Sequence, residues 1–94
     1  MWKEKFTEYL RYEKNYSSQT EISYLIDLTQ FKDFVVEETG SFNPSEIDSD
    51  IVRIWMSRLM EQGMKPSSVN RKLSSLKTFF NFLERKELIG KNPV

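Results

Sequence analysis

The sequence predicts an all-α domain of four helices, and three observations support that prediction. Glycine and proline occur in three close pairs, at positions 40/44, 63/66 and 90/93. Glycine just past a helix end, with proline soon after, is the usual stop signal. The segments between these pairs carry apolar stripes of helical period, and none alternates as a strand does; only a short stretch around Phe42 is a candidate for extended chain. Helices joined by such short connections pack as neighbours, so a single four-helix bundle is expected.

The first two helices are expected over residues 2–14 and 18–38. The first places four apolar side chains on one face, namely Trp2, Phe6, Tyr9 and Leu10. The second carries a stripe at 4-3-4 spacing, namely Tyr24, Leu28, Phe31 and Val35. Its start has the spacing of a capping box, in which Ser18 and Glu21 satisfy each other's backbone amides.

The third and fourth helices are expected over residues 49–62 and 66–87. The third turns Ile51, Ile54, Trp55 and Leu59 inward, with Asp48 or Ser49 as its cap. The fourth begins at Pro66, a residue suited to the first helical turn. Its stripe has the most regular period in the chain, namely Val69, Leu73, Leu76, Phe80 and Leu83.

Ile22 and Ile26 point away from the stripe of the second helix. Either the first helix covers them, or they belong to an interface in a larger assembly. Both alternatives are open at the level of sequence.

Composition excludes several classes of site. The chain has 94 residues, enough for one domain, and it contains neither cysteine nor histidine. Disulfides, thiolate zinc sites and histidine-based acid–base relays are therefore excluded, and we expect no metal and no cofactor. No run approaches the ~18 apolar residues of a membrane span, and the charged start does not resemble a signal peptide. A cytoplasmic protein without membrane contact is expected.

The net charge is zero, but the charge is unevenly distributed. Residues 20–62 hold three basic and nine acidic side chains, whereas residues 63–94 hold seven basic and two acidic ones. There is no acid between Gln62 and Leu83. Because a partner senses the field only within about 8–10 Å at moderate salt, this last third acts locally as a basic element.

The polar face of the fourth helix suits a DNA groove. Four side chains fall opposite the core (Ser67, Arg71, Ser74 and Thr78), and Ser75 and Lys77 lie on its shoulders. Small hydroxyls allow close approach and donate to phosphates, while the cations reach phosphates or guanine edges. The helix start, with Ser67 and Ser68, offers amides and a positive dipole end to a phosphate. A solvated face or a protein partner is the alternative interpretation.

The second helix begins with a related polar cluster, formed by Gln19, Thr20 and Ser23. Asp27 lies near the same side, and a bare carboxylate there would repel phosphate. Either Asp27 pairs with a cation such as Arg71, or this part of the helix does not meet DNA.

Two motifs resemble the core-binding domain of phage-integrase and Xer-type tyrosine recombinases. They are Ser17-x-x-Thr20-x-x-x-Tyr24-x-x-Asp27-Leu28-x-x-Phe31 and Ser68-x-x-Arg71-x-Leu73-Ser74-x-x-Lys77-x-Phe79. The resemblance spans essentially residues 1–94, including the closing Asn92-Pro93-Val94, which looks like the start of a linker to a catalytic domain. It implies a SAM-like bundle that forms half of a clamp around duplex DNA, with its second and fourth helices against the major groove.

The resemblance also implies what the residues do. Ser17, Thr20 and Tyr24 would lie on the first DNA-facing helix, although the stripe position of Tyr24 makes it mostly core. The complete set of expected DNA-binding residues is Ser17, Ser18, Gln19, Thr20, Ser23, Lys65, Ser67, Ser68, Arg71, Lys72, Ser74, Ser75, Lys77 and Thr78. Lys65, Arg71, Lys72 and Lys77 are expected to supply most of the phosphate contacts.

The catalytic residues of the family belong to a carboxy-terminal domain, which lies outside this sequence. None of the four tyrosines is expected to be a nucleophile, because no histidine and no separate basic cluster accompanies them. The chain is therefore expected to bind a recombination half-site, in support of DNA integration and recombination, without cutting it. In the full-length protein the first helix is expected to contact other protomers in a synaptic tetramer, leaving Trp2 and Phe6 partly exposed in an isolated, monomeric domain.

Two other functions fit the same sequence. In a helix-turn-helix regulator, residues 62–66 would be the turn and the fourth helix the recognition helix. In a protein-interaction bundle, the zero net charge would need no further explanation.

Overall fold

The computed structural model describes residues 2–87, 89–90 and 92–94, and the Trp2 side chain lies outside the described part. The helices are α1 (Trp2–Glu8), which continues as the π-helix η1 (Tyr9–Glu13), α2 (Ser18–Thr39), α3 (Ser49–Glu61) and α4 (Pro66–Arg85), with a 3-10 turn η2 (Pro44–Glu46). No strand occurs in the described ranges. The all-α prediction is confirmed, and Phe42 lies in a connection and not in a strand.

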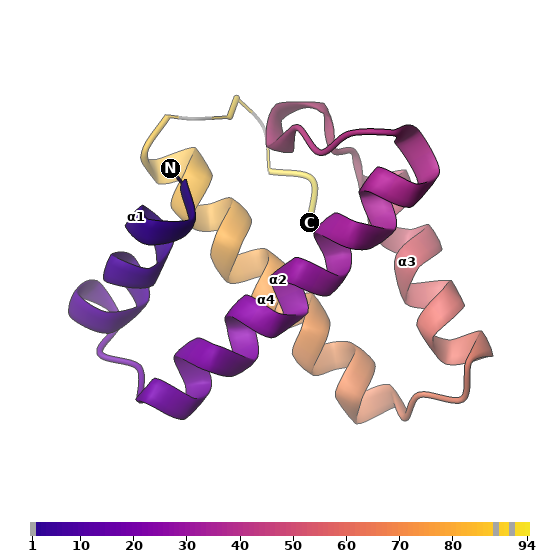
Figure 1. The fold of residues 1–94 in the computed structure, drawn as a ribbon, viewed down its shortest axis with the longest axis horizontal. Helices are drawn as coiled ribbons and strands as arrows, with labels where there is room; N and C mark the ends of the chain where they lie inside the picture. The colour runs from indigo at the N-terminus through magenta and orange to yellow at the C-terminus, as the bar shows by residue number, and fades with distance from the viewer. Residues whose placement is uncertain (1, 88, 91) are drawn as a thin grey trace.

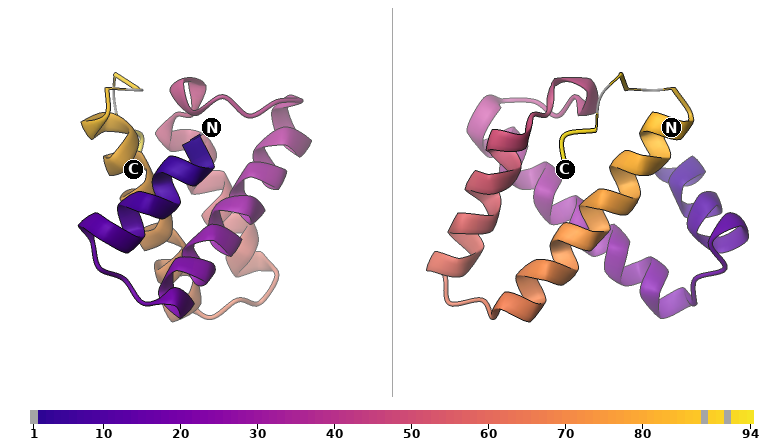
Figure 2. Two further views of the ribbon diagram at one scale, coloured as in Figure 1. Left: turned by 60° about the vertical axis from the view of Figure 1, so that its left-hand side comes forward. Right: turned by 180° about the vertical axis from the view of Figure 1, so that it is seen from behind.

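The two long helices α2 and α4 cross each other, with α1 and α3 on opposite sides of the crossing (Figure 1). The view from behind shows the same crossing with α4 in front (Figure 2). The fold is therefore a four-helix bundle whose central pair is an X. This crossing brings residues about 45 positions apart in the chain into contact.

Turn chemistry explains most helix boundaries. Gly40 follows α2 with a φ of +92°, and Gly63 follows α3 with a φ of +90°, in the left-handed region that glycine favours. The third predicted stop, at Gly90, is wrong. Helix α4 ends at Arg85, and Glu87, with a φ of +58°, takes the left-handed conformation instead.

The caps differ in one place from the prediction. Asp48 caps α3, accepting a 3.0 Å bond from the Ile51 amide. Helix α2, however, is capped by Ser17, whose Oγ accepts from the Thr20 amide at 3.2 Å. The predicted capping box between Ser18 and Glu21 is wrong, because Glu21 pairs instead with Arg11 of η1 at 2.8 Å.

The core is rich in aromatic rings and is shared by α1, α2, α3 and α4. Phe31 of α2 lies 5.1 Å from Trp55 of α3 and 6.5 Å from Phe80 of α4, measured between ring centroids. On the other side of the crossing, Phe6 of α1 lies 5.2 Å from Phe79 of α4. Helix α4 is thus packed by α1, α2 and α3 together.

Most predicted core residues are buried, Tyr24, Ile51 and Leu73 are half-buried, and Ile54 of α3 is exposed. Ile54 is 48% exposed, whereas Val52, which was not predicted, is 4% exposed. Residues 52, 55 and 59 form the buried stripe, and Ile54 projects about 100° away from Trp55 because each residue advances the helix by that angle. The expected inward position of Ile54 is wrong.

Candidate nucleic-acid interface

The outer face of α4 is polar and basic from its first turn to its middle. Ser67, Arg71, Ser74 and Lys77 are exposed, and Thr78 is half-buried. The opposite face is fixed in the core by Val69, Leu76, Phe80 and Leu83, each at most 3% exposed. Because these apolar side chains must face inward, the serines, arginine and lysine are presented to solvent. Acidic residues are absent from this face until Glu84, near the end of the helix.

Sequence reasoning missed one residue of this face. Asn70 is exposed and stands between Ser67 and Ser74 on the 3-4-3-4 row formed by residues 67, 70, 74, 77 and 81. An amide side chain is suited to adenine, to which it donates and from which it accepts. The helical spacing from Ser67 would have identified Asn70.

The start of α4 carries a further cation. Lys65 precedes the helix and is exposed, and no side chain caps this end. The Ser68 amide donates to the Lys65 carbonyl at 3.0 Å, so it is occupied within the turn. The expected offer of this amide to a phosphate is wrong, which leaves the Lys65 ammonium and the Ser67 hydroxyl as exposed donors.

The first turns of α2 supply the second polar element. Ser18 and Gln19 are exposed, while Thr20 and Ser23 are half-buried. Ser17 is exposed too, but its hydroxyl is engaged in capping and in a 3.0 Å bond to the Thr20 hydroxyl. Ser23 lies one turn before Asp27, which contacts α4, so this cluster adjoins the outer face of α4.

A buried ionic cluster joins the two helices where they cross. The Asp27 carboxylate is 0% exposed, and its Oδ1 accepts from Lys72 Nζ at 2.8 Å and from Arg71 Nη2 at 2.9 Å. Its Oδ2 accepts from Ser75 Oγ at 2.8 Å. Lys72 Nζ also donates to Gln30 Oε1. The alternative that Asp27 pairs with a cation such as Arg71 is therefore the one realised.

This cluster corrects two expected DNA contacts. Lys72 and Ser75 were expected at the surface, but they are 4% and 0% exposed. Both lie on the side of α4 that packs against α2, since α4 is covered by three neighbours and its buried arc is wider than one stripe. Arg71 keeps 53% of its side chain exposed and remains on the surface.

Tyr24 lies beside the candidate surface as a mostly covered aromatic residue. Its ring makes an edge-on contact with Tyr16 at 5.5 Å between centroids. Burial of the ring raises the pKa of the Tyr24 phenol, and the nearby Tyr16 raises it further by a smaller amount. The position agrees with the expectation that Tyr24 is mainly core.

We expect the Tyr24 phenol to ionise above the ordinary tyrosine pKa of about 10, as a late component in an alkaline titration followed by ultraviolet absorbance. A raised pKa in the fold means that the neutral phenol is favoured there. Its stabilising contribution is complete below the unfolded tyrosine pKa of about 10 and is lost as pH rises through the folded value. Tyr24→Phe should remove the late component and Tyr12→Phe should keep it; a late component that survives in Tyr24→Phe contradicts the assignment.

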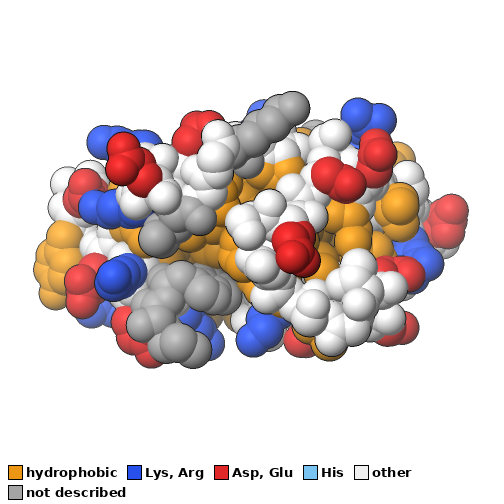
Figure 3. Space-filling view, turned by 90° about the horizontal axis from the view of Figure 1, so that it is seen from above, with side chains coloured by type: hydrophobic (Ala, Val, Ile, Leu, Met, Phe, Trp, Pro, Cys, Tyr) orange, Lys and Arg blue, Asp and Glu red, His pale blue; other side chains and the backbone are white. Residues whose placement is uncertain are grey.

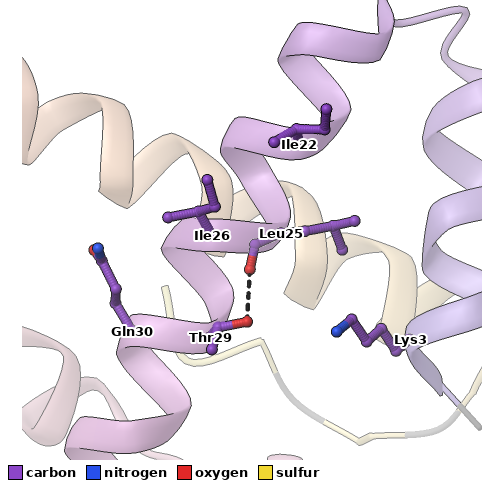
Figure 4. Close-up of a pocket in the computed structure, with 6 residues that line it drawn as sticks. All are labelled: Lys3, Ile22, Leu25, Ile26, Thr29 and Gln30. Carbon is purple, nitrogen blue, oxygen red and sulfur yellow. Dashed lines mark hydrogen bonds between the residues drawn. The ribbon is translucent and has the colours of Figure 1, made fainter.

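An apolar groove lies along α2 next to the Asp27 cluster, and Gln30 belongs to both, because it lines the groove and accepts a hydrogen bond from Lys72. Ile22 and Ile26 are 56% and 50% exposed, so the alternative in which the first helix covers them is wrong. Figure 4 shows them beside Leu25 and Thr29, with Lys3 of α1 extending toward the same groove. Phe6, expected to be partly exposed, is 0% exposed, and the matching expectation for Trp2 lies outside the described residues.

The face seen in Figure 3 differs in character from the outer face of α4. Seen from above the view of Figure 1, the surface shows acidic and basic side chains interspersed, with apolar atoms between them (Figure 3). Within the described ranges, no three acidic side chains converge as a metal site would require. The described helices also include none that is both long and apolar enough to cross a bilayer. The outer face of α4 with the start of α2 is therefore the candidate site.

Over residues 4–87 the chain matches the protein family described as phage integrase, N-terminal SAM-like domain. The chain belongs to this family. The match includes both motifs in Ser17–Phe31 and Ser68–Phe79, and it confirms the resemblance found in the sequence.

This SAM-like phage-integrase domain is similar to several bacterial proteins named tyrosine recombinase XerC. That of Chlorobaculum tepidum is 34% identical, over 99% of this chain and 29% of the relative. That of Halalkalibacterium halodurans is 38% identical over 98% and 30%, and that of Oceanobacillus iheyensis is 41% identical over 94% and 28%. The chain thus spans about 30% of the length of these relatives. No solved structure matches it significantly.

Proposed function

We propose that this chain is the DNA-binding, non-catalytic part of a tyrosine recombinase, which holds a recombination half-site while another part of the protein exchanges strands. The observation that supports this most is the outer face of α4, where exposed cations and hydroxyls form an acid-free surface next to the polar start of α2. Family membership and the printed names of the relatives support the recombination role. The domain would span residues 1–94.

The proposed contacts follow from exposure. Lys65, Arg71 and Lys77 supply the charge, and the side chains of Ser17, Ser18, Gln19, Thr20, Ser23, Ser67, Ser68, Ser74 and Thr78 supply small polar contacts. Asn70 is added to these contacts. Lys72 and Ser75 are not, because they are buried and bonded to Asp27. Neither Lys65 nor Lys77 has an ion-pair partner within the described part of the chain, so both are available to phosphates.

Assembly with other recombinase protomers is part of the same proposal. Because Phe6 is buried, the first helical segment would contribute exposed side chains such as Tyr12, which is 69% exposed. The Ile22–Ile26 groove is a second exposed apolar surface. The isolated chain is expected to be monomeric, which sedimentation would test.

The salt dependence of duplex binding tests the function. On a nonspecific duplex, Lys65, Arg71 and Lys77 all on phosphates predict a slope of log affinity against log salt of about −2.7, with affinity in the range of ~10⁻⁴–10⁻⁶ M at physiological salt. Lys77→Ala should make the slope less steep by about 1, because one phosphate contact is lost. Fluorescence anisotropy with a labelled duplex of about 30 base pairs, titrated at several salt concentrations, measures both quantities.

Arg53→Ala is the matched control, since Arg53 is an exposed cation on α3, away from the candidate surface, with a 76% exposed side chain. It should leave the slope unchanged. A chain that binds no duplex at low salt would favour the protein-interaction bundle, and a dimer that binds alone with nanomolar affinity would favour the helix-turn-helix regulator. If Lys77→Ala and Arg53→Ala changed the slope equally, the assignment of α4 to the DNA interface would be contradicted.

A further inference from the structure

We propose that Asp27 is a positioning residue that holds Arg71 ready to read a base edge, so that this pair gives the surface its sequence preference. The inference rests on the proposed DNA-binding function and assigns a division of labour within it. Arg71 discriminates between bases, and the lysines supply affinity that is independent of sequence.

The Asp27 carboxylate is held in one orientation. Both of its oxygens accept hydrogen bonds from α4, Oδ1 from Arg71 and Lys72 and Oδ2 from Ser75, at 2.8–2.9 Å. The carboxylate is fully buried, so water does not compete for these bonds. A carboxylate bound on both sides cannot rotate without breaking at least one charge-assisted bond.

Arg71 is bonded to this immobile carboxylate through one nitrogen of its guanidinium. The bond to Asp27 uses Nη2, and 53% of the side chain is exposed. A guanidinium has five N–H donors in a rigid fork, so most of them remain for a partner. Two neighbouring donors match the O6 and N7 acceptors of guanine, which form the commonest specific contact in the major groove.

Preorganisation distinguishes Arg71 from the neighbouring cations. An arginine already held in place loses less conformational freedom on binding than a free side chain does. Lys65 and Lys77 are exposed and make no ion pair within the described ranges, so each is a mobile point charge that follows phosphates of any sequence.

The cluster also keeps the surface attractive to DNA. Asp27 brings one negative charge, and Lys72 and Arg71 bring two positive charges within hydrogen-bond distance of it. Lys72 therefore balances the carboxylate, and Arg71 adds the net positive charge that faces outward. A carboxylate paired with Arg71 alone would cancel the charge that the interface needs.

The test compares Asp27→Asn with Glu21→Gln. Both variants remove one carboxylate charge from a buried position of α2 and weaken a bond to an arginine. The partner of Glu21 is Arg11 of η1, which is outside the interface. Glu21→Gln therefore makes the same change of charge and the same acid-to-amide substitution as Asp27→Asn, without affecting Arg71. The probe is a randomised duplex library bound to the 94-residue chain, followed by anisotropy with the selected duplex and with a scrambled one.

For the wild type we expect a guanine in the selected site, with a preference over the scrambled duplex of on the order of 10–100-fold, as one bidentate contact supplies. Asp27→Asn should reduce that preference to within about 3-fold, while its binding to scrambled duplex becomes stronger because a negative charge is lost. Glu21→Gln should strengthen both complexes alike and keep the preference. A merely structural role of Asp27 would weaken both complexes equally and leave their ratio unchanged.

A wild-type preference retained in folded Asp27→Asn overturns the positioning role. Failure of the wild type to bind any duplex at low salt overturns the proposed function itself, which is a separate outcome. If circular dichroism shows Asp27→Asn unfolded, Arg71→Lys and Ser75→Ala decide the question. Arg71→Lys keeps the charge and removes the fork, and Ser75→Ala frees one carboxylate oxygen. Both should lower the preference, and an unchanged preference in either contradicts the proposal.

Discussion

Asp27→Ala should lower the free energy of unfolding by about 3–5 kcal/mol, the loss typical when one partner of a buried ion pair is removed. Lys72 is the reason, because its side chain is 5% exposed and its ammonium would keep, among the described residues, Gln30 alone as a partner. A cation in an apolar environment without a counter-charge is strongly disfavoured. Urea unfolding followed by circular dichroism measures the loss.

A second substitution separates the lost ion pair from general damage. Lys72→Met removes the charge and retains most of the volume, so the double variant Asp27→Ala/Lys72→Met should recover much of the stability that Asp27→Ala loses. The exposed pair between Asp50 and Arg53, at 3.7 Å, is the control, and its disruption by Arg53→Ala should change stability by about 0–1 kcal/mol. Additive losses in the double variant would show that Lys72 does not depend on Asp27.

Phe31→Ala should destabilise the domain by about 3–5 kcal/mol, the range for removing a buried aromatic ring. Phe31 is 0% exposed and its ring contacts aromatic residues on two other helices, Trp55 and Phe80. The resulting cavity lies where α2, α3 and α4 meet, so no single helix can move to fill it. For a domain whose total stability is about 5–15 kcal/mol, this is a large fraction.

Phe34→Ala is the matched control, since Phe34 is on the same helix, half-buried, with its ring under the Arg58 guanidinium at 5.3 Å. Thermal unfolding of both variants should show a much larger fall in the midpoint for Phe31→Ala. Similar midpoints for the two variants would mean that the junction of the three helices is not the centre of the core.

Much of the candidate site was predictable from α4 alone. Once Val69, Leu76 and Phe80 must face inward, the helical period fixes that Ser67, Arg71 and Ser74 face outward. Lys72 and Ser75 were not predictable in this way. They lie about 60° and 120° from the centre of that stripe, on flanks whose burial depends on whether a second helix packs there.

The sequence by itself determined the helices and the direction of the apolar stripes of α2 and α4, because local propensity, turn residues and the 3.6-residue period act within one segment. It did not determine how wide the buried arc of each helix is, because that width depends on how many neighbours cover the helix. Only the tertiary structure showed that α2 and α4 cross at Asp27, that Lys72 serves the carboxylate and not a phosphate, and that Ile22 and Ile26 stay exposed. Packing between segments far apart in the chain decides these points.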